Sequence, residues 1–170
     1  MKYKQVVVIG SGDGSKYMKT SYDIGRYIAE QNWVLISGGK SGIMEAASKG
    51  AAEAGGIVIG ILPEYSSDTA NRYCNIVIPT GIGYARNLVN VLSGDVIVSI
   101  GGKSGTLSEM AYAWQFQKPI ISCIFTGGWS GRLADIEIDD RKGSEIYKAA
   151  SLEDVFTYLN KILNDKIESY

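Results

Sequence analysis

The stretch Val96-Ile97-Val98-Ser99-Ile100-Gly101-Gly102-Lys103-Ser104-Gly105-Thr106 decides how this chain folds. Its first half is a short, almost uninterrupted run of β-branched residues, which is typical of a strand buried on both faces of a sheet. Its second half places three glycines among polar residues where that strand ends, which is typical of a tight turn into a helix. The stretch therefore predicts a strand over 96–100, a glycine-rich loop and then a helix.

Similar apolar runs occur along the rest of the chain. They predict further strands over 6–9, 33–36, 57–61, 75–78 and 120–124. The intervening segments predict helices over 20–31, 42–54 and 85–92, and apolar residues at helical spacing predict a last helix around 152–163. Residues 126–143, which include Gly127-Gly128-Trp129, predict a long loop. This alternation predicts an α/β protein, a single Rossmann-like domain over 1–170 whose doubly wound, mostly parallel sheet is covered by helices on both faces.

Composition excludes several classes of function. The 170 residues include 17 Lys and Arg against 18 Asp and Glu, so the charge balance shows no basic excess, and we expect no nucleic-acid partner. The chain has no histidine and only two cysteines, which removes Ser-His-Asp and Cys-His catalysis and argues against a zinc site or a disulfide framework. We expect no metal site. No apolar run is long enough to span a membrane and no signal peptide is recognisable, so we expect a cytoplasmic protein without a membrane partner.

Three glycine clusters follow predicted strands, at residues 10–14, 37–42 and 101–106. In an open parallel sheet, ligands bind beyond the carboxyl ends of the strands, and the backbone N–H groups at a helix start attract anions. We therefore expect a small phosphate-bearing ligand at this edge. The expected binding residues are Gly10, Ser11, Gly12, Ser37, Gly38, Gly39, Gly101, Gly102, Lys103, Ser104, Gly105 and Thr106.

Two common phosphate-binding motifs are absent. Ser15 stands where the dinucleotide-binding motif Gly-x-Gly-x-x-Gly needs its last glycine. Val34 and Ile97 stand where a Walker A loop needs its first glycine. The clusters therefore belong to a different kind of phosphate site.

Two ordered motifs resemble those of the LOG ("Lonely Guy"), or lysine-decarboxylase-like, Rossmann superfamily. Gly38-Gly39-Lys40-Ser41-Gly42-Ile43-Met44 is similar to its first motif, and Gly105-Thr106-Leu107-Ser108-Glu109 is similar to the end of its second. Arg86 precedes Glu109 by 23 residues, close to the separation of the functional arginine and glutamate in that superfamily. Segments 83–87 and 127–129 are most similar to its molybdenum-cofactor carrier branch.

The resemblance implies two alternative functions. One is hydrolysis of the N-glycosidic bond of a nucleoside 5′-monophosphate, with Arg86 orienting the phosphate and Glu109 assisting cleavage as catalytic residues. The other is a non-catalytic carrier or sensor of a phosphorylated pterin, with molybdenum cofactor as carried ligand and no cofactor required for the protein itself. Gly101, Lys103 and Asn87 depart from the motifs of the hydrolases, which motivates the carrier alternative.

The resemblance also implies a homodimer or homotetramer, in which the helix face over 111–116 could meet its copy.

Several side chains keep two interpretations. Glu109 could serve the site or form a capping box with Thr106. Arg86 could bind phosphate or lie solvated on the surface, and Lys103 could complement a phosphate or be an ordinary surface lysine. Trp129 could stack on a ligand ring or anchor its own loop.

Overall fold

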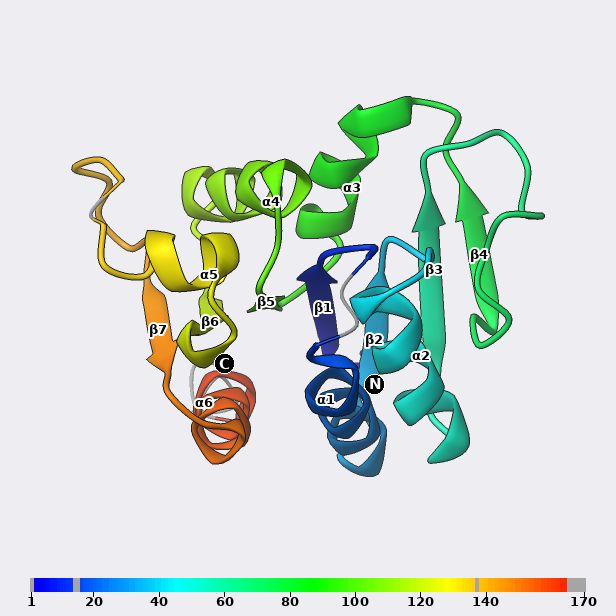
Figure 1. Ribbon diagram of the computed structural model, residues 1–170, viewed down its shortest axis with the longest axis horizontal. Coiled ribbons are helices and arrows are strands. Elements are labelled where there is room, and N and C mark those ends of the chain that lie inside the picture. The colour runs from blue at the N-terminus through cyan, green and yellow to red at the C-terminus, as the bar shows by residue number, and fades with distance from the viewer. Residues whose placement is uncertain (1, 14–15, 137, 165–170) are drawn as a thin grey trace.

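The computed structural model describes residues 2–13, 16–136 and 138–164, which form a seven-stranded, wholly parallel sheet (Figure 1). The strands are β1 (Gln5–Gly10), β2 (Val34–Ser37), β3 (Val58–Leu62), β4 (Ile76–Pro79), β5 (Val96–Ile100), β6 (Ile120–Cys123) and β7 (Ile146–Ala149). Their order across the sheet is β4-β3-β2-β1-β5-β6-β7. All seven carboxyl ends therefore lie at one edge.

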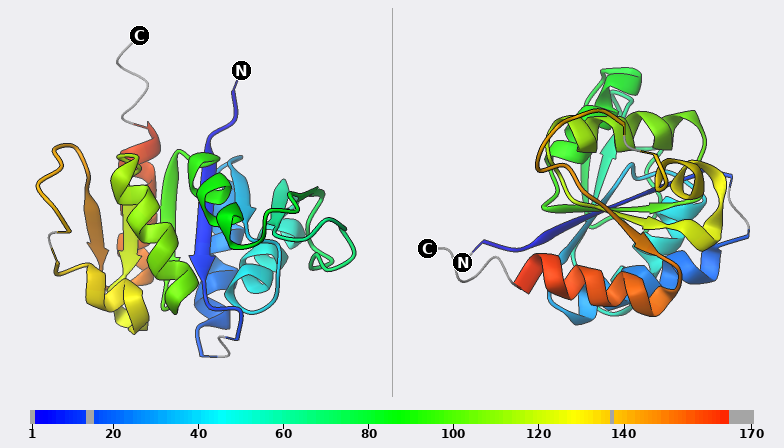
Figure 2. Two further views of the ribbon diagram at one scale, coloured as in Figure 1. Left: turned by 90° about the horizontal axis from the view of Figure 1, so that it is seen from above. Right: turned by 90° about the vertical axis from the view of Figure 1, so that its left-hand side faces the viewer.

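Six α-helices cover the sheet on both faces (Figure 2). They are α1 (Met18–Glu30), α2 (Ile43–Glu53), α3 (Arg86–Leu92), α4 (Ser104–Gln115), α5 (Gly128–Leu133) and α6 (Leu152–Asn164), with short 3-10 turns η1 (Gly83–Ala85) and η2 (Ile124–Thr126). Helices α1, α2 and α6 pack on one face, and α3, α4 and α5 on the other. The predicted doubly wound Rossmann-like fold is confirmed.

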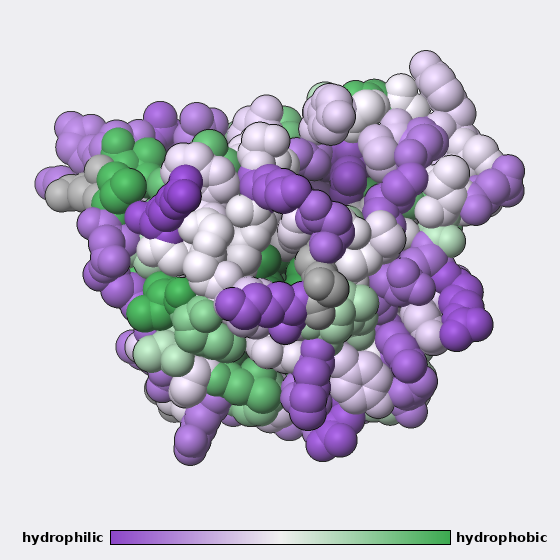
Figure 3. Space-filling view, in the orientation of Figure 1, coloured by the Kyte–Doolittle hydropathy of each residue, from purple (hydrophilic) through white to green (hydrophobic). Residues whose placement is uncertain are grey.

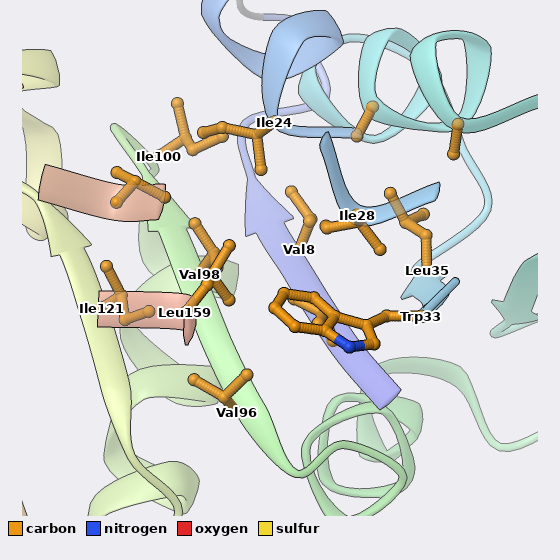
Figure 4. Packing of buried hydrophobic residues seen from close by; sticks show 14 of the residues in the cluster. Val8, Ile24, Ile28, Trp33, Leu35, Val96, Val98, Ile100, Ile121 and Leu159 are labelled. Atoms are coloured by element: carbon orange, nitrogen blue, oxygen red, sulfur yellow. The ribbon is translucent and has the colours of Figure 1, made fainter. Parts of the chain in front are cut away.

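Along each central strand, alternate side chains lie on opposite faces of the sheet and belong to two separate hydrophobic cores. Val6 and Val8 of β1 belong to the core under α1, α2 and α6, whereas Val7 and Ile9 belong to the core under α3, α4 and α5. Figure 4 shows the first core, where side chains of neighbouring strands meet those of α1 and α6. Each buried Val or Ile side chain stabilises the fold by roughly 1.5–3 kcal/mol, so these strands hold their register strongly.

The prediction of a continuous loop over 126–143 is wrong in its first part, where η2 ends and α5 follows. The glycines that suggested a loop, Gly127 and Gly128, do form a turn with positive φ angles of 64° and 59°. Helix α5 nevertheless begins at Gly128 itself. A helix of 6 residues is too short to show a periodic pattern. Strand β7 was not predicted because it lies at the sheet edge and is only partly buried.

The order of the strands fixes where a ligand can enter. Strand β1 lies between β2 and β5, so the chain winds outward in opposite directions from the β1/β5 pair. The loops after β1 and β5 therefore separate and leave a crevice at this switch point. Within the described ranges, none of the helices has the length and apolar character needed to cross a membrane.

Candidate functional site

A cavity of 280 Å³ lies at the switch point, between the segments that follow β1, β5 and β6. Its lining residues are Ser11, Asp13, Lys16, Tyr17, Ile43, Ile100, Gly101, Gly102, Lys103, Thr126 and Gly128. Apolar side chains and one aromatic ring thus lie beside two lysines. Figure 3 shows hydrophilic residues around the middle of the face seen in Figure 1, with a few hydrophobic residues visible below them.

The segment 101–105, which we call the anion loop, runs from the end of β5 into α4. The first-turn N–H groups of a helix lack intrahelical acceptors, and no side chain caps α4. Ser104 and Gly105, the first two residues of α4, are exposed. Thr106 is 3% exposed and lies under Gly102, away from solvent. Of the three predicted phosphate-binding residues at the start of α4, two are therefore open to solvent and one is not.

Two charged side chains connect the loops on either side of the crevice. Lys103 donates to Asp13 Oδ2 at 2.6 Å, which joins the anion loop to the segment after β1. Hydrogen bonds from Lys103 and Ser11 lower the pKa of Asp13 to about 2. Both members of the pair are exposed, so an anionic ligand can compete with Asp13 for Lys103 at little cost.

The first and second glycine clusters occupy different surroundings. Ser11 lines the cavity, whereas Gly10 packs against Ile43 and Gly12 accepts a hydrogen bond from Ser41. Residues 37–39 are buried and do not line the cavity. A Cβ at Gly38 would overlap Nη1 of the Arg86 guanidinium, so the second loop is filled by Arg86.

Arg86 and Glu109 belong to one polar cluster, in which Glu109 is buried and Arg86 is partly buried. Glu109 is 7% exposed and accepts a hydrogen bond from Asn90 Nδ2 at 2.9 Å. Burial raises the pKa of Glu109 to about 7, against the opposing effects of Asn90 and Arg86. Burial also lowers the pKa of Arg86, while Glu109 and Glu64 act in the opposite direction. The two interact electrostatically, and no direct ion pair joins them in the described structure.

This polar cluster extends to Lys40, which donates to Glu64 Oε1 at 2.5 Å. Three of its buried atoms have no hydrogen-bond partner among the described residues, namely Glu64 Oε2, Arg86 Nε and Asn90 Oδ1. Buried polar atoms are nearly always paired in folded proteins. The cluster is thus equipped to bind a further polar group or water.

The capping-box interpretation of Glu109 is wrong. Helix α4 begins at Ser104, with Lys103 at the N-cap position and no side-chain cap bond. A capping box would have placed Thr106 at the N-cap, but Thr106 is already inside the helix. Arg86 is likewise not a solvated surface arginine, since desolvation is the largest effect on its pKa.

A second depression of 520 Å³ adjoins the anion loop on its other side, between η1, α3 and α4. It is lined by Tyr84, Ala85, Asn87, Ser104, Gly105, Ser108 and Tyr112. Asn87 Nδ2 donates to Ser108 Oγ at 2.8 Å, which ties α3 to α4 here. A ligand held at the start of α4 can therefore extend to either side of the loop.

Sequence analysis missed several lining residues. Asp13 lies within the first glycine cluster and Thr126 lies in η2, the turn that follows β6, so the rule that sites gather at carboxyl ends could have found both. Tyr17 and Ile43 carry no such local signal, because only the packing of the loops turns them toward the cavity, whereas Ile100 is the last residue of β5 and obeys the same rule. Within the described ranges, no group of three acidic or cysteine side chains could hold a metal ion.

Comparison with known proteins places this chain in a family. The model of the SLOG cluster4 family matches residues 3–156. An uncharacterized protein of Archaeoglobus fulgidus is 43% identical over 123 residues, which cover 72% of this chain and 81% of that protein.

Two solved structures are similar over nearly the whole chain. The molybdenum cofactor binding protein from the phototrophic bacterium Rippkaea orientalis is 36% identical, with a TM-score of 0.84 and coverage of 96% of this chain and 99% of that chain. The Moco carrier protein from Chlamydomonas reinhardtii is 30% identical, with a TM-score of 0.80 and coverage of 96% and 99%. The sequence-level resemblance to the carrier branch is confirmed at the level of fold and family.

Proposed function

We propose that this chain, which belongs to the SLOG cluster4 family, is a carrier of molybdenum cofactor, a phosphorylated pterin. The observation that carries the proposal is the cavity at the β1/β5 switch point, beside the uncapped start of α4. Similar structures that extend over 96% of the chain are named for binding or carrying this cofactor, which supports the same ligand class here. The carrier interpretation thereby takes precedence over the hydrolase interpretation.

The residues present fit such a ligand. The N–H groups of Ser104 and Gly105 suit the phosphate, and Lys103 supplies a positive charge beside them. A flat ring could lie against the apolar and aromatic wall of the cavity, where Ile43 and Tyr17 are found. The protein contributes binding and exclusion of water, and needs no cofactor of its own for this role.

The proposal is tested by loading. Purified protein is incubated with purified molybdenum cofactor and passed through a desalting column, and bound pterin and molybdenum are then quantified. We expect retention of both, and delivery to an apo-molybdoenzyme afterwards. Lys49→Met is the control for the loss of one positive charge from the protein. Lys49 lies on α2 away from the cavity lining, so this variant should retain as much cofactor as wild type. Protein that retains neither pterin nor molybdenum contradicts the carrier function.

The buried carboxyl of Glu109 favours nucleoside 5′-monophosphate hydrolysis as a second candidate. A carboxyl with a pKa of about 7 beside Arg86 suits proton transfer near neutral pH. In that reaction water adds to the ribosyl anomeric carbon, the N-glycosidic bond breaks, and the base leaves with a proton. Glu109→Gln would then reduce base release by at least ~10²-fold while nucleotide affinity changes only a few-fold.

This second candidate is checked with a panel of nucleoside 5′-monophosphates, by chromatography of the free base and calorimetry of binding. Absence of base release from the whole panel by wild type excludes hydrolysis of those compounds and leaves the carrier function. Full turnover by Glu109→Gln would remove Glu109 from the catalytic role.

We further propose that the chain is a single cytoplasmic domain that assembles as a homodimer or homotetramer and has neither a membrane nor a nucleic-acid partner. The near-equal numbers of acidic and basic residues support the last point. Fluorescence anisotropy with labelled single-stranded oligonucleotides at physiological salt is the direct test. Salt-dependent binding at micromolar protein would contradict it.

A further inference from the structure

The segment after β6 has a role that ligand contacts alone do not explain. We propose that Thr126 and Ser130 are positioning residues that fix the orientation of the anion loop and thereby determine affinity for the phosphate of the ligand. The proposal rests on the carrier function, because it concerns the same phosphate. It assigns a purpose to the Gly127-Gly128-Trp129 turn beyond the place of Gly128 in the cavity lining.

Thr126 holds the N–H group at the start of the anion loop. Gly101 N donates to Thr126 Oγ1 at 2.7 Å, and Thr126 Oγ1 lies 2.5 Å from the carbonyl oxygen of Cys123. A hydroxyl has a single proton, so Thr126 donates it to Cys123 and accepts from Gly101. The Gly101 N–H group is therefore unavailable to a ligand, and both hydrogen bonds of the 5% exposed Thr126 hydroxyl are made within the protein.

Residues at the start of α5 donate hydrogen bonds to carbonyl groups of the anion loop. Ser130 N donates to Gly101 O at 3.0 Å, and Ser130 Oγ lies 2.9 Å from the same oxygen. Trp129 N donates to Gly102 O at 3.2 Å. An anion is repelled by carbonyl oxygens and attracted by N–H groups. By drawing two carbonyls toward α5, these bonds leave the following N–H groups to face the ligand.

Glycine makes this contact between two backbones possible. A Cβ at Gly128 would lie 2.6 Å from the carbonyl carbon of Gly101, too close for any side chain. Gly101 and Gly102 also adopt positive φ angles of 59° and 95°. Trp129 packs against the core under α3, α4 and α5, so it anchors its own turn. The two glycines of the turn thus allow α5 to pack directly against the anion loop.

A buried chain of serines attaches this arrangement to the sheet. Ser130 Oγ lies 3.0 Å from Ser99 Oγ of β5, and Ser99 Oγ lies 3.2 Å from Ser122 Oγ of β6. Ser122 Oγ in turn donates to Ser130 O at 2.6 Å. All three side chains are fully buried. Because Ser130 Oγ has a single proton, it donates either to Ser99 Oγ or to Gly101 O, and the loss of a hydrogen bond from these buried hydroxyls is costly.

The test compares Thr126→Val, which keeps the shape and removes the hydroxyl, with Thr126→Ser, which restores it. Thr80→Val is the matched control, because the Thr80 hydroxyl also donates to a backbone carbonyl, that of Leu62 at 2.7 Å, away from the cavity lining. Affinity is measured by calorimetry with purified molybdenum cofactor and with adenosine 5′-monophosphate as probes. Thermal melting is measured on every variant.

We expect Thr126→Val to weaken binding by at least ~10-fold, since misaligned donors lose hydrogen bonds to a charged group. Thr126→Ser should bind within a few-fold of wild type, and Thr80→Val should bind normally even if it melts earlier. Should Thr126→Val fail to fold, Ser130→Ala provides the same comparison with a weaker expected loss. Tight wild-type binding that Thr126→Val or Ser130→Ala retains in full overturns the positioning role and leaves the carrier function intact. If wild type binds neither probe, both the positioning role and the carrier function are contradicted.

Discussion

Replacement of Glu109 by glutamine should abolish most of the pH dependence of folding stability near neutral pH. Glu109 is buried against Asn90 and Arg86, and burial raises its pKa from 4.5 to about 7. Between these two values the unfolded chain has an ionised carboxylate while the folded chain keeps it protonated. Unfolding then releases a proton, so the stability of wild type falls as pH rises through this window.

The size of the effect follows from the two pKa values. A difference of about 2.5 between the folded and unfolded pKa corresponds to about 3 kcal/mol of unfolding free energy. The stabilisation is fully present below pH 4.5 and is lost as pH rises through about 7. Glutamine cannot ionise and still offers Asn90 an amide oxygen. The Glu109→Gln chain should therefore gain on wild type by about 3 kcal/mol between pH 4.5 and pH 8.

Urea unfolding at a series of pH values measures the difference. The chain has no histidine, the side chain that ordinarily titrates between pH 5 and 8, so the window is unusually clear. Glu53→Gln is the control, because exposed Glu53 also accepts a side-chain hydrogen bond, from Tyr22 at 2.7 Å. Its stability should follow the pH profile of wild type. If the difference in unfolding free energy between Glu109→Gln and wild type stays constant with pH, the reasoning is refuted. Such a result would mean that Arg86 keeps the Glu109 carboxylate ionised throughout.

Three further predictions concern the anion site and assembly. Lys103→Met should weaken binding of a phosphate-bearing ligand by about 10-fold, as expected for one lost charge-assisted contact, with little change in melting temperature; calorimetry and melting curves check this. Gly38→Ala should displace the Arg86 guanidinium and lower stability, whereas Gly105→Ala, with open space around its Cβ position, should fold normally; urea unfolding of both variants checks this. Light scattering should show a dimer or tetramer, and a charge introduced within 111–116 should shift it toward monomer; a wild-type monomer at micromolar concentration would contradict the assembly.

The fold was predictable because the strands are short and almost wholly apolar. In a parallel sheet buried on both faces, a run such as 96–100 has few alternative environments. The glycine clusters that follow such runs also located the carboxyl edge, and the start of α4 within it. Short elements such as α5 and β7 were not predictable, since neither is long enough or apolar enough to leave a periodic signal.

Pairings between distant residues were decided by the tertiary structure alone. The sequence by itself determined an α/β sheet and predicted an anion site after β5, and the resemblance suggested an Arg86–Glu109 pair. It did not show that Arg86 fills the loop at Gly38, nor that Thr126 occupies the Gly101 N–H group. Local sequence sets backbone conformation over a few residues, whereas burial and hydrogen-bond partners depend on which strands become neighbours. Two similar Gly-Gly-Lys-Ser-Gly loops therefore differ in their surroundings, because Arg86 packs against the first, whereas the second lines the cavity at the switch point.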